Sequence, residues 1–137
     1  MTITKKITVG ALERCDLPEL AITQLHVRID TGAQTSSLHV DEIKEFKREK
    51  IKWVSFDIHP DIHNVDQIIS CEAKVEAKRI IKSSNGDSER RYVIKTLFKI
   101  GGQSWTIQLT LGDRSGMTYL MLLGRQAMED RILVDPS

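Results

Sequence analysis

The residues best suited to chemistry are Asp30, Thr31 and Gly32. They follow a stretch in which Val27 and Ile29 alternate with a charged residue, so a carboxylate leaves a predicted strand and enters a glycine turn. Because glycine lacks a Cβ, backbone groups can approach such a turn closely. Two carboxylates presented in this way share one proton and activate a water molecule. The triplet alone is weak support, since Asp-Ser/Thr-Gly occurs by chance in about one chain in twenty of this length.

A second segment, near the C-terminus, fits the first. The apolar run 119–123 ends in Gly124-Arg125, and residues 98–109 are typical of a strand, a turn and a strand. The order of these features resembles the retropepsins, the aspartic proteases of retroviral type. More closely, the chain resembles a bacterial retropepsin-like family catalogued as ATP-dependent zinc proteases. The segments that carry this resemblance are Ile29–His39 (IDTGAQTSSLH), His59-Pro60, Arg91–Ile94, Met121–Arg125 and Leu133–Pro136.

The resemblance implies a catalytic role for Asp30-Thr31-Gly32. The chain has one Asp-Thr-Gly, so each subunit of a homodimer would contribute one Asp30, and the pair would titrate as a unit. Thr31 would form a hydrogen bond across the two-fold axis, and Gly32 and Ala33 would line the cleft beside the substrate backbone. Three further residues, Leu123, Gly124 and Arg125, would support the active-site loop from the C-terminal strand.

Two departures from the retroviral pattern are visible. Retroviral enzymes commonly carry, after Asp-Thr-Gly-Ala, an acid that pairs with the arginine of the Gly-Arg motif. This chain has Gln34 and Thr35 there, so Arg125 must find another partner. In addition, roughly thirty extra residues, between Asp41 and Ile80, separate the active-site loop from the next conserved feature of the retroviral fold.

That feature is a flap, a hairpin that closes over the cleft. The resemblance implies that the segment Lys78–Ile94 around Asn85-Gly86 is its counterpart here, and we expect it to be mobile. From residue 74 to 99 eight basic residues face three acidic ones, which favours an anionic substrate, although a hairpin with solvated charges explains the pattern equally well. We expect Lys82, Arg90 and Arg91 to contact the substrate. The resembled family is associated with glutamate-ligating enzymes, so an acidic peptide or glutamyl tail is the implied substrate.

Metal and cofactor motifs are absent from the sequence. There is no His-Glu-x-x-His and no Gly-x-x-x-x-Gly-Lys-Ser/Thr, so we assign neither a metal nor a cofactor. A zinc site built from Asp30, His39 and His59 is the alternative that stays open. Cys71 has no identifiable histidine partner, and the adjacent Ser36, Ser37 and His39 do not make a triad, which is defined by geometry.

The hydrophobic pattern has mostly the period of strands. Residues 41–50 suit a short helix or a hairpin, and residues 124–129 suit a short helix. We therefore expect one all-β domain over residues 1–137, a retropepsin-like closed barrel with one or two short helices. The predicted strands are 25–29, 53–58, 69–75, 76–82, 91–100, 105–111 and 119–123.

Bulk composition narrows the function classes. The 137 residues carry 20 Lys and Arg against 19 Asp and Glu, so net charge gives no reason to expect nucleic acid. Neither a signal-peptide core nor a run of about 20 apolar residues occurs, so we expect no membrane association and a cytoplasmic protein with both cysteines reduced. An aspartic peptidase that acts as a homodimer on a peptide or protein substrate is the leading interpretation. A non-catalytic peptide-binding module and a metal-dependent hydrolase are the alternatives.

Overall fold

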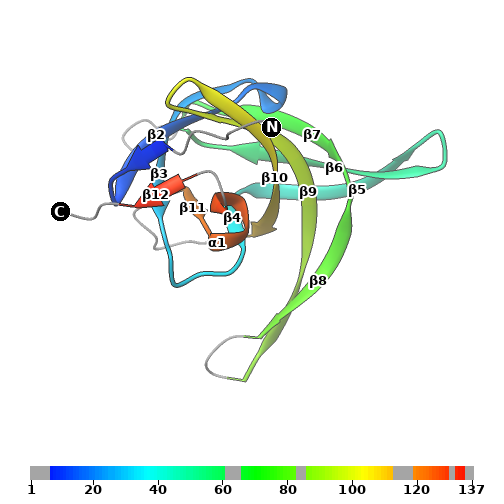
Figure 1. Ribbon diagram of the computed structural model, residues 1–137. Coiled ribbons are helices and arrows are strands. Elements are labelled where there is room, and N and C mark those ends of the chain that lie inside the picture. The colour runs from blue at the N-terminus through cyan, green and yellow to red at the C-terminus, as the bar shows by residue number, and fades with distance from the viewer. Residues whose placement is uncertain (1–6, 61–65, 83–85, 113–118, 130–131, 135–137) are drawn as a thin grey trace, which may run out of the picture.

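A closed barrel of six strands forms the body of the protein. The computed structural model describes residues 7–60, 66–82, 86–112, 119–129 and 132–134. The strand order is β10-β4-β11-β3-β2-β9, and pairing of β9 with β10 closes the ring (Figure 1). The barrel strands are β2 (Leu12–Leu17), β3 (Ile22–Ile29), β4 (Ser36–His39), β9 (Ser88–Ile100), β10 (Gln103–Gly112) and β11 (Met121–Leu123). The predicted all-β barrel is confirmed.

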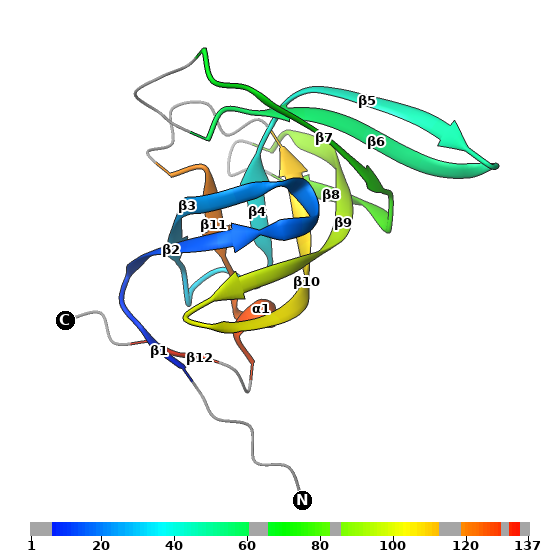
Figure 2. The same ribbon diagram turned by 90° about the horizontal axis from the view of Figure 1, so that it is seen from above.

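Three other groups of strands lie outside the ring. The strand β8 (Ala77–Lys82) pairs with β9 and makes the hairpin predicted as the flap. A separate sheet holds β5 (Asp41–Arg48), β6 (Ile51–Ile58) and β7 (Ile69–Lys74), and therefore accounts for most of the extra residues. Figure 2 shows β1 (Ile7–Val9) beside β12 (Ile132–Val134), as a parallel pair away from the barrel.

Two short helical segments complete the described part of the chain, as expected. A 3-10 turn covers Pro18–Leu20, and α1 covers Arg125–Met128. Trp105 holds α1 against the core, because its indole Nε1 donates to the carbonyl of Ala127 at 2.9 Å. Its ring also meets Phe98 edge to face, with 5.3 Å between centroids. The residues that follow Gly124 are thus fixed to the barrel wall.

Alternation of apolar residues explains β3, whereas β11, which ends beside the candidate site, is buried throughout. In β3, Val27 is fully buried and Ile29 is 7% exposed. In β11, Leu123 is fully buried and Leu122 is 7% exposed. Parallel pairing of Leu123 with Ile29 brings the ends of β11 and β3 together. Asp30 and Gly124, which directly follow these two residues, therefore start adjacent loops.

Two hairpins of the chain use the same turn with different residues. Gly101-Gly102 joins β9 to β10 with φ of 57° and 82°, whereas Glu49-Lys50 joins β5 to β6 with φ of 52° and 69°. Two-residue hairpin turns need positive φ, which glycine adopts freely and side chains with a Cβ do not. The hairpin alternative for residues 41–50 is confirmed, and its turn is strained.

Replacing Glu49 with Asn and Lys50 with Gly should raise the free energy of unfolding by about 1–2 kcal/mol, because the strain is relieved. Chemical denaturation measures this change. The reciprocal exchange, Gly101→Glu with Gly102→Lys, should lower the free energy of unfolding by a similar amount. If neither exchange alters stability, the left-handed backbone at Glu49 and Lys50 is not a source of strain.

Candidate active site

The loop that carries Asp30 is tied to the start of α1 by backbone hydrogen bonds. The N–H of Asp30 donates to the carbonyl of Leu123 at 2.9 Å. In the opposite direction, the N–H of Arg125 donates to Ala33 at 2.8 Å and that of Gln126 to Gln34 at 3.1 Å. The two motifs found in the sequence therefore form one unit. This unit positions the carboxylate.

The carboxylate of Asp30 is half-buried and oriented by its own loop. Its Oδ1 accepts a hydrogen bond from the N–H of Gly32 at 3.0 Å. Thr31 and Gly32 are exposed, and Ala33 is half-buried. The turn thus holds one carboxylate oxygen and presents the neighbouring residues to solvent, where another molecule could meet them.

Gly124 is needed for space rather than for an unusual conformation. Its φ of −93° suits any residue, but a Cβ would lie 2.5 Å from both the carbonyl carbon and the carbonyl oxygen of Thr35. Ser36 completes this contact, since its hydroxyl accepts a hydrogen bond from the N–H of Gly124 at 3.0 Å and is buried. Sequence reasoning assigned Ser36 no role.

Arg125 finds its partners in the backbone of the active-site loop. Its guanidinium Nη1 lies 3.2 Å from the carbonyl oxygen of Thr31 and 3.5 Å from that of Gly32. These bonds replace the carboxylate that Gln34 and Thr35 cannot supply. Arg125 thus joins the C-terminal motif directly to the turn that follows Asp30.

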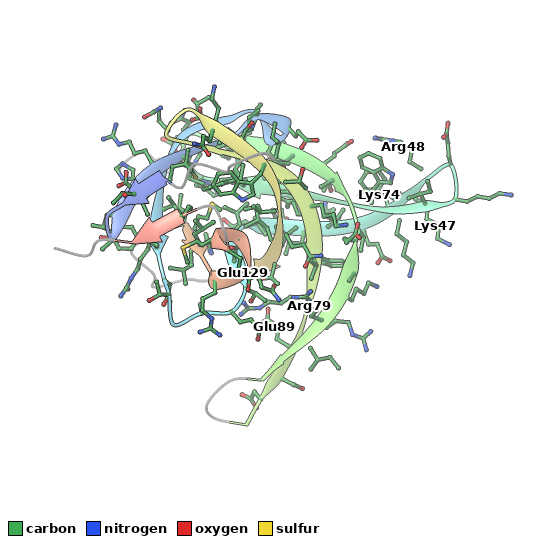
Figure 3. All side chains as sticks on the ribbon, viewed as in Figure 1. Lys47, Arg48, Lys74, Arg79, Glu89 and Glu129 are labelled. Atoms are coloured by element: carbon green, nitrogen blue, oxygen red, sulfur yellow. The ribbon has the colours of Figure 1, made fainter. Side chains whose placement is uncertain are left out.

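The β8–β9 hairpin has two unlike faces. Arg79 is directly opposite Arg91, so both lie on one face, whereas Arg90 is opposite Ile80 and lies on the other. Arg91 packs on Gly112, and Arg79 donates to Gln108 at 3.0 Å. In Figures 1 and 3 the concave side of this hairpin is turned towards α1, and Arg79 and Glu89 lie there.

The residues expected to contact the substrate are thus separated. Arg91 lies on the concave side with Arg79, which sequence reasoning passed over and which the strand register alone could have found. Arg90 is exposed on the opposite face, and the side chain of Lys82 lies outside the described residues. The roles of all three stay predictions.

Much of the positive charge near the hairpin is balanced locally. Lys78 pairs with Glu45 at 2.8 Å, Lys95 with Glu76 at 3.2 Å, and Arg91 with Glu89 at 3.1 Å. The hydrogen bond within the first pair lowers the pKa of Glu45 and raises that of Lys78. The positive electrostatic field at the hairpin is therefore weaker than the excess of basic over acidic residues between positions 74 and 99 implied.

The sequence of residues 8–137 matches the RimB-like family, described as the retropepsin-like aspartic endopeptidase RimB. The chain belongs to this family. Proteins named probable alpha-L-glutamate ligase are 48% identical over 132 residues in Shewanella pealeana and 46% over 135 residues in Desulfotalea psychrophila. These matches cover 96% and 98% of the chain but 29% of each relative, so the chain spans under a third of their length.

A solved structure that is similar to this chain supports the fold. A protein of unknown function from Legionella pneumophila is 28% identical and superposes with a TM-score of 0.80. The match covers 96% of this chain and 95% of that one. Family description and fold thus agree on a retropepsin-like barrel. The ATP and zinc label of the resemblance is not part of that description.

The histidines considered as zinc ligands gather around a different acid. Asp41 lies 3.0 Å from Nε2 of His59 and 3.8 Å from Nε2 of His39, through its two carboxylate oxygens. His26 is exposed on β3, and His63 lies outside the described residues. Across the described ranges, His, Cys, Asp and Glu form no group of three or more that could hold a metal.

Both cysteines are free and buried, as expected. Burial raises the pKa of Cys15 to about 12 and that of Cys71 to about 11, so both thiols stay protonated at neutral pH. A protonated thiol is a poor nucleophile, which argues against Cys71 as a catalytic group. Among the described residues, no helix is long and apolar enough to cross a membrane.

Proposed function

We propose that the chain is an aspartic peptidase whose active unit is a homodimer and whose substrates are glutamate-rich peptides. The clamped Asp30 loop carries the proposal. Its carboxylate is oriented by Gly32, while Arg125 and Leu123 hold the backbone on either side. A cytoplasmic location follows from the free cysteines as part of the same proposal.

Two Asp30 carboxyls side by side would share one proton, because like charges at that distance cannot both ionise. The ionised carboxylate takes a proton from water as the water oxygen attacks the peptide carbonyl carbon. The protonated partner donates to the carbonyl oxygen. Collapse of the intermediate then breaks the C–N bond and returns a proton to the departing nitrogen, and the dyad regains its single shared proton.

The terminal strands support the dimer. In the described residues β1 and β12 pair only with each other, so each has an open edge. Two-stranded sheets are marginally stable in water, and additional strands stabilise them. Pairing between two copies at these edges would extend the sheet.

The relatives support the substrate class. They are named probable alpha-L-glutamate ligases, and this chain matches 29% of their length, so the matched segment is joined to a longer remainder in each relative. A hydrolase joined to a ligase is well placed to act on the chain that the ligase builds. Arg79 and Arg91 on the concave face of the hairpin would meet the carboxylates of such a chain.

Arg91→Gln should raise KM for a glutamate-rich peptide, because a positive charge facing the substrate is lost. The increase should be only about fivefold, since Glu89 already neutralises part of that charge. Arg90→Gln removes an equal charge from the opposite face and should leave KM unchanged. For neutral peptides of the same length, KM should be the same for both variants and for the wild-type protein. The measurement is steady-state hydrolysis of both peptide types.

Equal losses for acidic and neutral peptides would mean that Arg91 is structural, and the acidic substrate would be withdrawn. If the wild-type dimer binds these peptides but cleaves none, the protein is a non-catalytic binding module. One Asp-Thr-Gly per chain favours that second function whenever the chain stays monomeric.

A further inference from the structure

The β5–β6 hairpin extends well beyond the barrel and ends in a concentration of positive charge. Figures 1 and 2 both show it projecting on its own. Between Phe46 and Trp53 the chain has four basic residues and one acidic residue. We call the set Lys47, Arg48, Lys50, Lys52 and Lys74 the basic hairpin end; Figure 3 labels three of its members there.

The hairpin keeps features that cost stability and add nothing to the core. Lys47 lies directly opposite Lys52, and like charges in that position repel. The turn at Glu49 and Lys50 has positive φ at both residues. Locally unfavourable choices of this kind concentrate where a protein binds something.

Arg48 determines which groups remain available to a ligand. Its guanidinium lies 4.7 Å from the ring centre of Trp53 and 5.4 Å from that of Phe46, and it pairs with Glu72 at 2.8 Å. The guanidinium therefore covers ring surface that single-stranded nucleic acid would use for base stacking. Across the described residues, Lys47, Lys50, Lys52 and Lys74 form no ion pair, and Glu45, which attracts Lys52, is itself paired with Lys78.

We propose that the basic hairpin end is an anchoring site for a glutamate-rich chain, separate from the Asp30 loop. The choice of glutamate rests on the proposed function, whereas the site itself rests on the excess of lysines without ion pairs and on the strained turn. Flexible lysines on both faces and at the tip suit an extended polyanion whose carboxylates are also flexible. A long acidic substrate would thus be held at two places.

The test is binding of a fluorescent decaglutamate peptide, followed by fluorescence anisotropy at low salt in the Asp30→Asn background. Lys47→Gln with Lys52→Gln should weaken binding about tenfold and flatten its salt dependence. The same double variant should have a higher melting temperature, since the repulsion between the two lysines is gone. Arg14→Gln with Lys99→Gln, an equal loss of charge from exposed barrel positions, should change neither property.

An equal loss of affinity in the control variant would show that net charge alone is responsible and would overturn the proposal. Tighter binding of a single-stranded oligonucleotide of the same charge would also overturn it, in favour of a nucleic-acid site. Because the measurement is binding to an inactive variant, it stands even if the wild-type protein hydrolyses nothing. Absence of hydrolysis would count only against the proposed peptidase.

Discussion

Replacing Asp30 with Asn should lower kcat/KM for a glutamate-rich peptide by about 10⁴-fold or more and leave the fold intact. The amide cannot accept the proton from water. Its Oδ1 can still accept the hydrogen bond from Gly32, so the turn should persist. Peptide hydrolysis and thermal unfolding, measured side by side, separate the two effects. Hydrolysis by the Asn variant at a rate comparable to wild type would mean that the aspartic mechanism is wrong.

The same variant tests the shared dyad. Mixing wild-type protein with an excess of Asp30→Asn should reduce the activity of the wild-type subunits, because mixed pairs contain one carboxylate and cannot supply both acid and base. Activity that is unaffected by the mixture would indicate a site complete within one subunit. A chelator should leave the wild-type rate unchanged, since no metal is assigned.

The second large effect is expected at Gly124. Gly124→Ala should lower the free energy of unfolding by about 3 kcal/mol, because the new methyl group meets the backbone of Thr35 at 2.5 Å and backbone cannot rotate away. Activity should fall even at temperatures where the variant is fully folded, since the displaced backbone of Thr35 belongs to the loop that carries Asp30. Denaturation by urea and hydrolysis at a temperature well below the midpoint measure the two separately.

Gly112→Ala is the matched control. There the added methyl group would meet the guanidinium of Arg91 at 2.9 Å, and a side chain can shift at little cost. We expect a loss of less than about 1 kcal/mol. Similar losses at both glycines would mean that the loop around Thr35 is compliant and that Gly124 does not fix its position.

The link between the Asp30 turn and Gly124 was predictable from the resemblance to retropepsins, in which the two motifs occur in the same order. Glycine permits close backbone approach, which is found at Gly124, whereas a Cβ at Gly32 would meet only Oδ1 of Asp30, at 3.3 Å. The partner of Arg125 was not predictable, because the acceptors are carbonyl oxygens of Thr31 and Gly32, and every residue has one. Motif residues could be named, but not the bonds between them.

Other parts of the fold depend on tertiary pairing. Ser36, Ser37 and Leu38 in β4 are all buried, so the strand lacks the alternation that marks a half-exposed one. It exists because β10 and β11 pair with its two edges. The different faces of Arg90 and Arg91 required the β8–β9 register, and the β5–β6 turn was ambiguous because Glu-Lys is not a turn dipeptide.

The parallel pairing of β1 with β12 has a mechanical consequence. Ile7 lies beside Ile132 and Val9 beside Val134, so the chain enters at one end of this pair and leaves at the other. Tension applied through both ends would slide the two strands lengthwise and load their hydrogen bonds together instead of opening them one at a time. A domain linked through both ends would therefore resist stretching first at its terminal strands, before force reached the Asp30 loop.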